Sequence, residues 1–480
     1  MTLRAAARRL HSLKTVQPSF TARTFSSTSS IASLPRDAKP RTLKENSLPT
    51  PDPGPESTTA AFLNDRTPYM VPTYVRPNPV FVKGQGCYLW DMDNRRFLDL
   101  TAGIAVNALG HCDPEIAKVI SEQSETLIHA SNLYHNPWTG ALSKSLIDST
   151  LESGAMRDAH QVFICNSGTE ANEAAIKFAR KVGKTLDSTG EKHEFVSFYG
   201  SFHGRTMGAL SATPNPKYQT PFSPMIPGFK YGTYNDIEQL ESLVTDKTCG
   251  VIIEPIQGEG GVNVATPEFL IALRERCDQV GAVLIYDEIQ CGLSRTGTLW
   301  AHGNPAFAPK DGSKSAAHPD IMTTAKALGN GIPIGATIVT EKVSSAIKTG
   351  DHGTTFGGNP LACRVAHHIV DRLAASELQN GVELKSSQFV SGFKALQEKY
   401  PDIISEIRGL GLILGVQLSE KYASKANDVL TAARQRGLLI ITAGDGCLRF
   451  VPSLNITDEQ IQTGLRILRE SFEAVFAGEA

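Results

Sequence analysis

Short apolar segments that alternate with longer amphipathic segments place the strongest constraint on how this chain folds. Six such segments lie between residues 162 and 340, and their side chains are mostly β-branched or aromatic, with no alternation of polar and apolar positions. They are residues 162–165, 195–198, 250–254, 282–286, 321–323 and 335–340. Strands buried on both faces have this composition, and helical patterns between them indicate crossover connections. The sequence therefore predicts an α/β fold built around a mostly parallel sheet.

The length of 480 residues predicts more than one domain. We expect residues 116–350 to form a large domain around the sheet. Residues 64–115 and 351–480 carry further strand patterns, the second segment together with several helical ones, and we expect the two to form a smaller α+β domain. Residues 303–318 contain several Pro, Gly, Ser and Ala residues and predict a surface loop inserted into the large domain.

The first 36 residues differ from the rest in composition. They contain five arginines and one lysine, many Ser and Thr residues, and no acidic residue before Asp37. This profile is typical of a mitochondrial transit peptide and predicts a location in the mitochondrial matrix; a plain disordered basic tail is the alternative. Residues 37–63 are rich in Pro, Ser and Thr and predict a disordered linker.

Charge and cysteine usage narrow the classes of partner. The formal net charge is −2, which gives no electrostatic reason to expect binding to nucleic acid or to an anionic membrane. The sequence contains no stretch of about 18 predominantly apolar residues, so it predicts no membrane-spanning helix. The eight cysteines are scattered singly, without a Cys-x-x-Cys pair, so we expect no metal site.

The first motif with chemical content is Cys-Asn-Ser-Gly-Thr-Glu-Ala-Asn-Glu at residues 165–173, directly after a predicted strand. Gly168 allows a tight turn, and Thr169 offers a hydroxyl at the start of a predicted helix. The exposed amides and the positive end of the helix dipole would form a phosphate site there. The alternative is an ordinary helix start with acidic residues in its first turn.

Asp287 and Gln290 follow the buried strand at 282–286. An acid at the carboxyl end of such a strand lies where open α/β sheets bind ligands. A buried carboxylate needs a cationic partner, and the protonated nitrogen of a pyridine ring would supply one, while Gln290 would reach a phenolic oxygen of the same ring. A strand-end Asp that caps the next helix is the alternative.

Lys326 follows another buried strand and precedes a glycine-rich turn at 329–331. Burial lowers the pKa of a lysine by disfavouring its charge, which prepares the amine for Schiff-base chemistry. Taken alone, the position means little, since most lysines lie on the surface. A predicted phosphate site, an acid at the end of a strand and a lysine after a strand follow one another along the chain. Together they favour a functional site over three unrelated structural residues.

These motifs resemble those of the class III (ornithine-type) aminotransferases of the aspartate-aminotransferase fold, and the resemblance extends from about Tyr69 to the C-terminus. Further matching motifs lie at residues 103–111, 201–206, 254–261 and 352–360. The resemblance implies fold type I, with a large domain around a mostly parallel sheet, a smaller α+β domain, and pyridoxal 5′-phosphate (PLP) as cofactor.

The resemblance also implies a role for individual residues. Lys326 would bind PLP covalently and then move the proton, so Lys326 and Asp287 are the expected catalytic residues. The expected cofactor-binding residues are Gly168 and Thr169 at the phosphate, Phe202 stacked on the ring, Asp287 and Gln290 at the polar edge of the ring, Lys326, and Thr355. Because Thr355 would reach the phosphate of a neighbouring subunit, the resemblance implies a homodimer.

For substrates, the motifs are closest to the branch of the class that acts on N2-acetyl-L-ornithine, with 2-oxoglutarate as acceptor and glutamate as product, within arginine biosynthesis. The expected substrate-binding residues are Arg205, Thr354, Glu259 and Arg449. Thr354 would line the pocket of Arg205 from across the subunit interface, and Glu259 and Arg449 would form a gate for carboxylates. An ordinary edge-strand arginine is the alternative for Arg449. Ornithine, 4-aminobutyrate or succinylornithine remain alternative donors, a decarboxylase or aminomutase is an alternative reaction, and a non-catalytic cofactor-binding scaffold is an alternative class.

Overall fold

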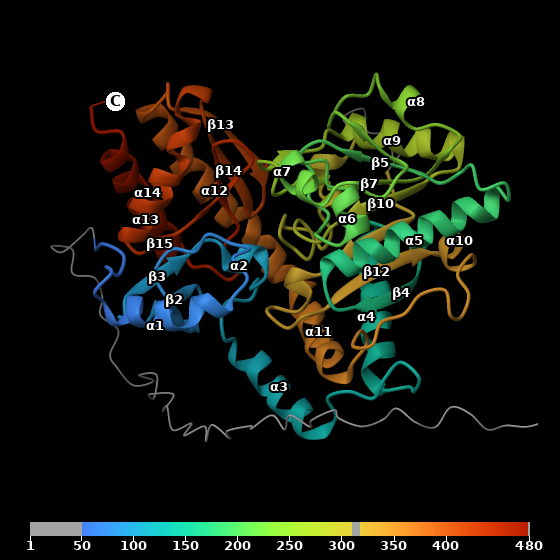
Figure 1. Ribbon diagram of the computed structural model, residues 1–480, viewed down its shortest axis with the longest axis horizontal. Coiled ribbons are helices and arrows are strands. Elements are labelled where there is room, and N and C mark those ends of the chain that lie inside the picture. Colours follow the sequence, from blue (N-terminus) through green and yellow to red (C-terminus); the bar gives the residue numbers. More distant parts are fainter. Residues whose placement is uncertain (1–49, 310–316, 479–480) are drawn as a thin grey trace, which may run out of the picture. The chain divides into compact units, whose positions relative to one another are not determined.

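The structure of this chain is a computed structural model that describes residues 50–309 and 317–478. The predicted transit peptide at residues 1–36 lies outside the described residues, and so does the predicted linker up to residue 49. Figure 1 shows the arrangement of the described elements.

Seven strands form the largest sheet, in the order β4-β12-β11-β10-β7-β5-β6 (Figure 1). Every residue of four of these strands, β7, β10, β11 and β12, is buried. Strands buried on both faces cannot carry polar alternation, which explains their continuous apolar sequence. The seven strands are β4 (Ala159–Cys165), β5 (Glu194–Phe198), β6 (Phe229–Gly232), β7 (Thr248–Ile253), β10 (Val283–Asp287), β11 (Ile321–Thr324) and β12 (Gly335–Thr340).

The prediction of a mostly parallel sheet is confirmed. Strands β6, β5, β7, β10 and β11 pair in parallel, and only β12 runs antiparallel to its two neighbours, β11 and β4. Since β12 lies between them, β4 and β11 point in the same direction. The sequence did not predict edge strand β6, because its residues are only half-buried and carry little of the apolar signal.

Alternate side chains of β10 show why both faces of this sheet are covered. Val283 and Ile285 pack into an apolar cluster with α5 (Gly168–Leu186), whereas Leu284 and Tyr286 pack into another with α9 (Pro267–Val280). Successive side chains of a strand point to opposite faces, so the two helices lie on opposite sides of the sheet (Figure 1).

A second sheet joins the two ends of the described chain. Strands β1 (Phe81–Gln85), β2 (Tyr88–Asp91) and β3 (Arg96–Asp99) form an antiparallel meander, and β15 (Leu438–Leu439) pairs in parallel with β3. Leu98 N donates to Gly437 O at 2.8 Å, and Leu100 N donates to Leu439 O at 3.0 Å. Segments about 340 residues apart in sequence therefore share one sheet.

A third sheet, in the order β13-β14-β17-β16, is fully antiparallel. Its strands all lie within residues 351–480, where the sequence predicts strands together with several helices, and long helices of the same segment accompany it. The strands are β13 (Ile404–Leu410), β14 (Ile413–Leu418), β16 (Ile441–Ala443) and β17 (Cys447–Phe450), and the helices are α11 (Pro360–Leu373), α12 (Ser376–Lys399), α13 (Ala426–Gln435) and α14 (Asp458–Val475). Strands β8 (Ile256–Gln257) and β9 (Asn263–Val264) form a small separate pair.

Residues 50–63 differ from the disordered linker that their composition predicts. Helix α1 (Thr58–Arg66) begins within this segment, where Ser57 caps it by accepting a hydrogen bond from Ala60 N at 3.0 Å. Upstream of the helix, Asp52 forms an ion pair with Arg434 at 2.8 Å. Contacts with distant residues hold this Pro-rich segment, and such contacts leave no local signal in its sequence.

The remaining helices are short or connect the sheets. They are α2 (Ala102–Ala105), α3 (Pro114–Thr126), α4 (Pro137–Ser153), α6 (Met207–Ser211), α7 (Pro216–Gln219), α8 (Leu240–Leu243) and α10 (Glu341–Ser344). In the predicted loop at 303–318, the described residues include the short 3-10 helix η5 (Pro305–Phe307). None of the described helices is both long and apolar enough to span a membrane, and the described residues contain no cluster of His, Cys, Asp and Glu suited to a metal ion.

Candidate active site

The carboxyl ends of five strands that run in the same direction bring most of the predicted site residues together. Gly168 follows β4, Phe202 follows β5, Glu254 follows β7, Asp287 ends β10, and Lys326 follows β11. All five line one cavity of about 360 Å³. Ligands of open α/β sheets bind at this edge, because loops of adjacent parallel strands converge there.

Lys326 lies at the start of the short 3-10 helix η6 (Lys326–Leu328), directly after the buried strand β11. Its φ of +42° lies in the left-handed region, which costs a residue with a side chain of the order of 1–3 kcal/mol. Burial, and next the positive charge of Arg449, lower the pKa of the Lys326 amine to about 8. About a tenth of this lysine is therefore uncharged at pH 7, far more than of an ordinary lysine, and the uncharged amine is the form that acts as a nucleophile or proton acceptor.

The N-terminus of α5 and the residues just before it also line the cavity, through residues 166–169. Ser167 caps the helix by accepting a hydrogen bond from Glu170 N at 3.3 Å. A Cβ atom on Gly168 would lie 2.9 Å from the side chain of Ile289, so the chain requires a glycine for this close approach. The positive end of the helix dipole and its unpaired amides suit a phosphate group.

The hydroxyl of Thr169 contacts the loop that follows β5. Thr169 Oγ1 lies 2.9 Å from Thr206 Oγ1 and accepts hydrogen bonds from Arg205 N at 3.3 Å and Thr206 N at 3.4 Å. Gly204, with a φ of +135°, allows this approach, because a Cβ atom there would lie only 2.2 Å from Thr169 Oγ1. The loop and the start of α5 therefore form one packed unit.

Asp287 is 3% exposed and has two side-chain partners that the sequence did not reveal. Asp287 Oδ2 accepts hydrogen bonds from Asn172 Nδ2 and His203 Nδ1, each at 2.8 Å. Within the described residues, His203 Nε2 has no hydrogen-bond partner. These two donors fix the orientation of the carboxylate. The only sequence signal for Asn172 is a polar residue on the otherwise apolar face of α5.

Glu254 is a second buried acid in the cavity, for which the sequence predicted no role. Its two carboxylate oxygens accept hydrogen bonds from Phe202 N at 2.8 Å and Gly258 N at 3.2 Å. Burial raises the pKa of Glu254 to about 7, against the opposing effect of His203. Glu254 thus anchors the backbone of Phe202, whose ring lines the cavity.

Arg205 also lines the cavity, and its side chain is exposed. Its guanidinium carbon lies 3.8 Å from the ring centroid of Tyr218 and 5.5 Å from that of Phe202. Among the residues that the structure describes, no carboxylate lies within ion-pair distance of Arg205. An arginine that is stacked and not ion-paired is available to bind a carboxylate.

Arg449 lies on β17, and its side chain is only 2% exposed. Arg449 Nη2 forms an ion pair with Glu259 Oε2 at 2.8 Å, and Nη1 donates a hydrogen bond to Gln290 Oε1 at 3.1 Å. Because β17 pairs with β14 on one side and β16 on the other, the alternative of an ordinary edge-strand arginine is wrong. Gln290 lines the cavity and connects this ion pair to it.

Thr354 and Thr355 lie on the loop before α11. Asn166 Nδ2 donates a hydrogen bond to Thr354 Oγ1 at 3.0 Å, which places Thr354 beside the segment that leads into α5 in its own chain. Thr355 is exposed and does not line that cavity. The structure thus brings together all the predicted residues except Thr355.

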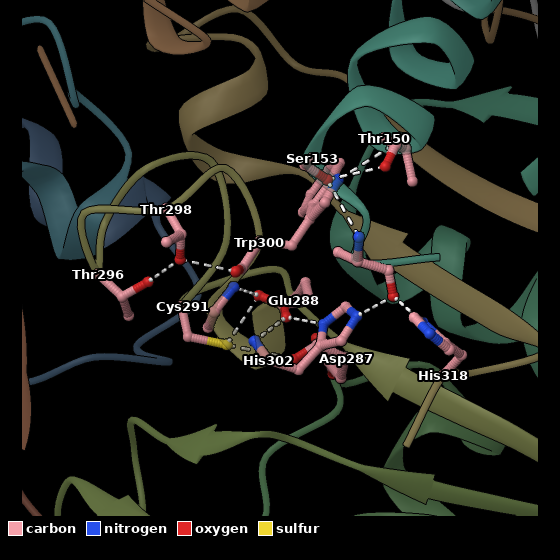
Figure 2. A network of polar contacts seen from close by, with 12 residues as sticks. Thr150, Ser153, Asp287, Glu288, Cys291, Thr296, Thr298, Trp300, His302 and His318 are labelled. Carbon is pink, nitrogen blue, oxygen red and sulfur yellow. Dashed lines mark hydrogen bonds and ion pairs between the residues drawn. The ribbon is translucent and has the colours of Figure 1, made fainter. Parts of the chain in front are cut away.

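A polar network behind Asp287 fixes the loop that follows β10 (Figure 2). Glu288 accepts hydrogen bonds from Ala301 N at 2.9 Å and Cys291 Sγ at 3.3 Å, and it contacts His302 Nδ1 at 2.6 Å. His302 Nε2 in turn lies 2.9 Å from Ala155 O, at the end of α4. These buried contacts hold the chain on the carboxyl side of Asp287 in place.

Comparison with protein families gives one match that covers most of the chain. Residues 70–472 match the family described as Aminotransferase class-III. The mitochondrial acetylornithine aminotransferase of Neurospora crassa is 64% identical over 428 residues, which are 89% of this chain and 90% of the relative. That of Saccharomyces cerevisiae is 46% identical over 415 residues, covering 85% and 95% of the two chains.

Solved structures give the same fold. The N-acetylornithine aminotransferase of Stenotrophomonas maltophilia is 40% identical with a TM-score of 0.71, and the match covers 84% of this chain and 98% of that one. The ornithine aminotransferase of Toxoplasma gondii is 32% identical with a TM-score of 0.80, covering 88% and 96%.

Proposed function

The chain belongs to the class-III aminotransferases, and from this premise we propose that it transfers the δ-amino group of N2-acetyl-L-ornithine to 2-oxoglutarate. The products are N-acetyl-L-glutamate 5-semialdehyde and L-glutamate, and the reaction serves arginine biosynthesis. The enzyme depends on PLP, as this family does. The observation that carries the proposal is a single cavity that contains Lys326, Asp287, the N-terminus of α5 and Arg205.

The residues of the cavity fit PLP. Gly168 and Thr169, at the start of α5, would hold the phosphate, where a larger side chain than glycine would collide with Ile289. The buried carboxylate of Asp287 would pair with the ring nitrogen, and Phe202 would stack on the ring. When bound, PLP supplies an electron sink for the carbon that carries the amino group.

Lys326 and Asp287 are the proposed catalytic residues. Burial lowers the pKa of Lys326 to about 8, so its amine can attach the cofactor and afterwards accept and return the proton of the substrate carbon. Asp287, oriented by His203 and Asn172, would keep the ring nitrogen protonated.

Two arginines distinguish the two substrates. Acetylornithine has one carboxylate and a distant amine, and we assign that carboxylate to Arg205, with Thr354 lining the same pocket from across the subunit interface. Glutamate has two carboxylates, and we assign the binding of its second carboxylate to Arg449. In the structure Glu259 neutralises Arg449, which suits the acetylornithine half of the reaction. In the glutamate half, Glu259 would turn away and release Arg449.

Sequence identity distinguishes the proposed donor from its nearest alternative. The TM-score is higher for the Toxoplasma gondii ornithine aminotransferase than for the Stenotrophomonas maltophilia N-acetylornithine aminotransferase. Sequence identity to this chain, however, is 32% for the ornithine aminotransferase and 40% for the N-acetylornithine aminotransferase. The fold is common to both activities, whereas donor choice depends on side chains in the cavity. Identity is therefore the better guide. Lys326, Asp287 and Arg205 are all in place, which argues against a non-catalytic scaffold.

We further propose that the enzyme is a homodimer in which Thr355 binds the PLP phosphate of the partner subunit. Large apolar side chains at the surface support a second copy as partner, since exposed apolar patches mark interaction sites. They include Tyr69, Val71, Val75, Leu133, Tyr134 and Phe356, which follows Thr355 directly. We also propose that residues 64–115 and 351–480 form one small domain beside the large domain of 116–350, a division that the pairing of β3 with β15 supports.

For the location, the mitochondrial matrix is supported by the names of the curated relatives from Neurospora crassa and Saccharomyces cerevisiae, which are both called mitochondrial. The basic, acid-poor composition of residues 1–36 agrees with it.

A donor panel with the PLP-loaded enzyme tests the activity. Acetylornithine, ornithine, succinylornithine and 4-aminobutyrate are each supplied with 2-oxoglutarate, and glutamate is quantified by mass spectrometry. We expect the highest kcat/KM with acetylornithine. Lys326→Ala should lower kcat by at least about a thousandfold, because it removes the proton-transfer group. Lys184→Ala, at an exposed position of α5, is the matched control and should keep wild-type activity.

Two results would contradict the proposal separately. Activity of Lys326→Ala within about tenfold of wild type would show that Lys326 has no catalytic role. A donor preferred over acetylornithine would leave the aminotransferase reaction intact and replace only the substrate.

A further inference from the structure

The strand that leads to Lys326 also carries a buried hydroxyl beside Asp287. Thr323 lies on β11, close to the end that Lys326 follows, and it is fully buried. In the parallel pairing of β10 with β11, Thr323 is the register partner of Asp287, and Thr323 O accepts a hydrogen bond from Glu288 N at 3.0 Å. The sheet therefore holds the main chain of Thr323 directly beside the acid that we assign to the ring nitrogen of PLP.

A single amide connects the hydroxyl of Thr323 to the carboxylate of Asp287. Thr323 Oγ1 donates a hydrogen bond to Asn172 Oδ1 at 2.8 Å. From the other end of the amide, Asn172 Nδ2 donates to Asp287 Oδ2 at 2.8 Å and to His203 O at 2.7 Å. Asn172 lies fully buried on α5, so these three bonds give both polar atoms of its amide a partner, as a buried amide requires.

These bonds brace the carboxylate from a neighbouring strand. Thr323 is bonded through its carbonyl to the main chain that follows Asp287, and through its hydroxyl and Asn172 to the carboxylate itself. Without the hydroxyl, Asn172 Oδ1 would be a buried acceptor without a donor, which is unfavourable. The amide would shift to reach another donor, and Asp287 would lose a partner that is held at a fixed distance.

We propose that Thr323 is a positioning residue whose hydroxyl, through Asn172, holds the Asp287 carboxylate in place for the ring nitrogen of PLP. Thr323 does not line the cavity, so it acts without touching cofactor or substrate. Strand β11 thereby serves the site twice, since it positions the acid and also leads to Lys326. The assignment rests on the proposed function for the pairing of Asp287 with PLP. It goes beyond that function because it gives a threonine outside the cavity a part in the reaction.

Three substitutions separate the hydroxyl from the packing of the side chain. Thr323→Val replaces the hydroxyl by a methyl group and keeps the shape, whereas Thr323→Ser keeps the hydroxyl and removes the methyl group. Thr337→Val is the matched control, since Thr337 is the register partner of Thr323 on β12 and is equally buried. The hydroxyl of Thr337 donates at 2.9 Å to Ala171 O, so this bond ends in the main chain of α5 instead of the Asn172 amide.

The absorbance of bound PLP, followed against pH without substrate, reports on the ring nitrogen. A protonated ring nitrogen repels a second proton on the cofactor, so a carboxylate that is less well placed should move the midpoint of the absorbance change to higher pH. We expect a rise of at least about 0.5 pH unit in Thr323→Val, and a midpoint within about 0.2 pH unit of wild type in Thr323→Ser and Thr337→Val. The single-turnover rate with acetylornithine should fall about fivefold to fiftyfold, and only in Thr323→Val.

A midpoint in Thr323→Val that equals the midpoint in Thr337→Val would overturn the proposal and reduce Thr323 to a packing residue. An equal rise in Thr323→Ser would also overturn it, because the lost methyl group would then be responsible. If Thr323→Val does not fold, Thr323→Ala, which adds no buried methyl group, is measured in its place with the same expectation. If wild type fails to use acetylornithine while the midpoint still rises, the substrate assignment fails and the role of Thr323 stands.

Discussion

Asp287 illustrates how a single charge can control the reaction. Its carboxylate accepts hydrogen bonds from His203 and Asn172 and faces the cavity that we assign to PLP. Asp287→Asn keeps the shape of the side chain but removes its negative charge, so the ring nitrogen of PLP loses the partner that favours its protonation. We expect the single-turnover rate with acetylornithine to fall by about a hundredfold to ten-thousandfold, while gel filtration still shows bound PLP. Asp278→Asn, at an exposed position of α9, is the control. Near-normal rates in Asp287→Asn would refute the electronic role.

Two elements meet where we propose that the phosphate binds: the loop after β5 packs on the start of α5. Gly204 makes this possible, since a Cβ atom would lie 2.2 Å from Thr169 Oγ1. Gly204→Ala should therefore displace Thr169 and raise the dissociation constant of PLP by about tenfold or more, as measured by equilibrium dialysis. Gly190→Ala is the matched control: its φ of +85° is also positive, but no atom of the described chain lies within 4 Å of the added carbon. If both variants bind PLP equally, the packing of loop on helix does not shape the phosphate site.

The whole molecule is expected to work only as a dimer, because Thr355 is exposed and lies outside the cavity of its own chain. Mixing inactive Lys326→Ala with inactive Thr355→Asp should restore about a quarter of wild-type activity, since half of the randomly mixed dimers contain one intact site of two. Lys326→Ala mixed with Asp287→Asn should restore none, because both residues belong to the same cavity. No recovery in the first mixture, after mass spectrometry has verified subunit exchange, would show that each site is built from one chain.

Much of the fold and of the candidate site could be predicted from local sequence patterns. The six strands were predictable because each is a short run rich in β-branched or aromatic residues, and the structure confirms the mostly parallel sheet. Gly168, Asp287 and Lys326 were predictable as site candidates because each ends such a strand or lies within a few residues of its carboxyl end, at the edge where loops converge. The half-buried edge strand β6 and the helix within residues 50–63 left no comparable signal.

The sequence by itself determined six strands of the largest sheet, where the turn into α5 lies and which lysine follows a buried strand, since neighbouring residues encode these features. Only the tertiary structure decided that Arg449 meets Glu259, that His203 and Asn172 meet Asp287, and that Tyr218 lies against Arg205. The partners of the first pair are 190 residues apart. Contacts of this kind depend on the order of strands in the sheets and on the paths of the connections between them. No local pattern of side chains specifies that order, because it is selected by the packing of the whole chain.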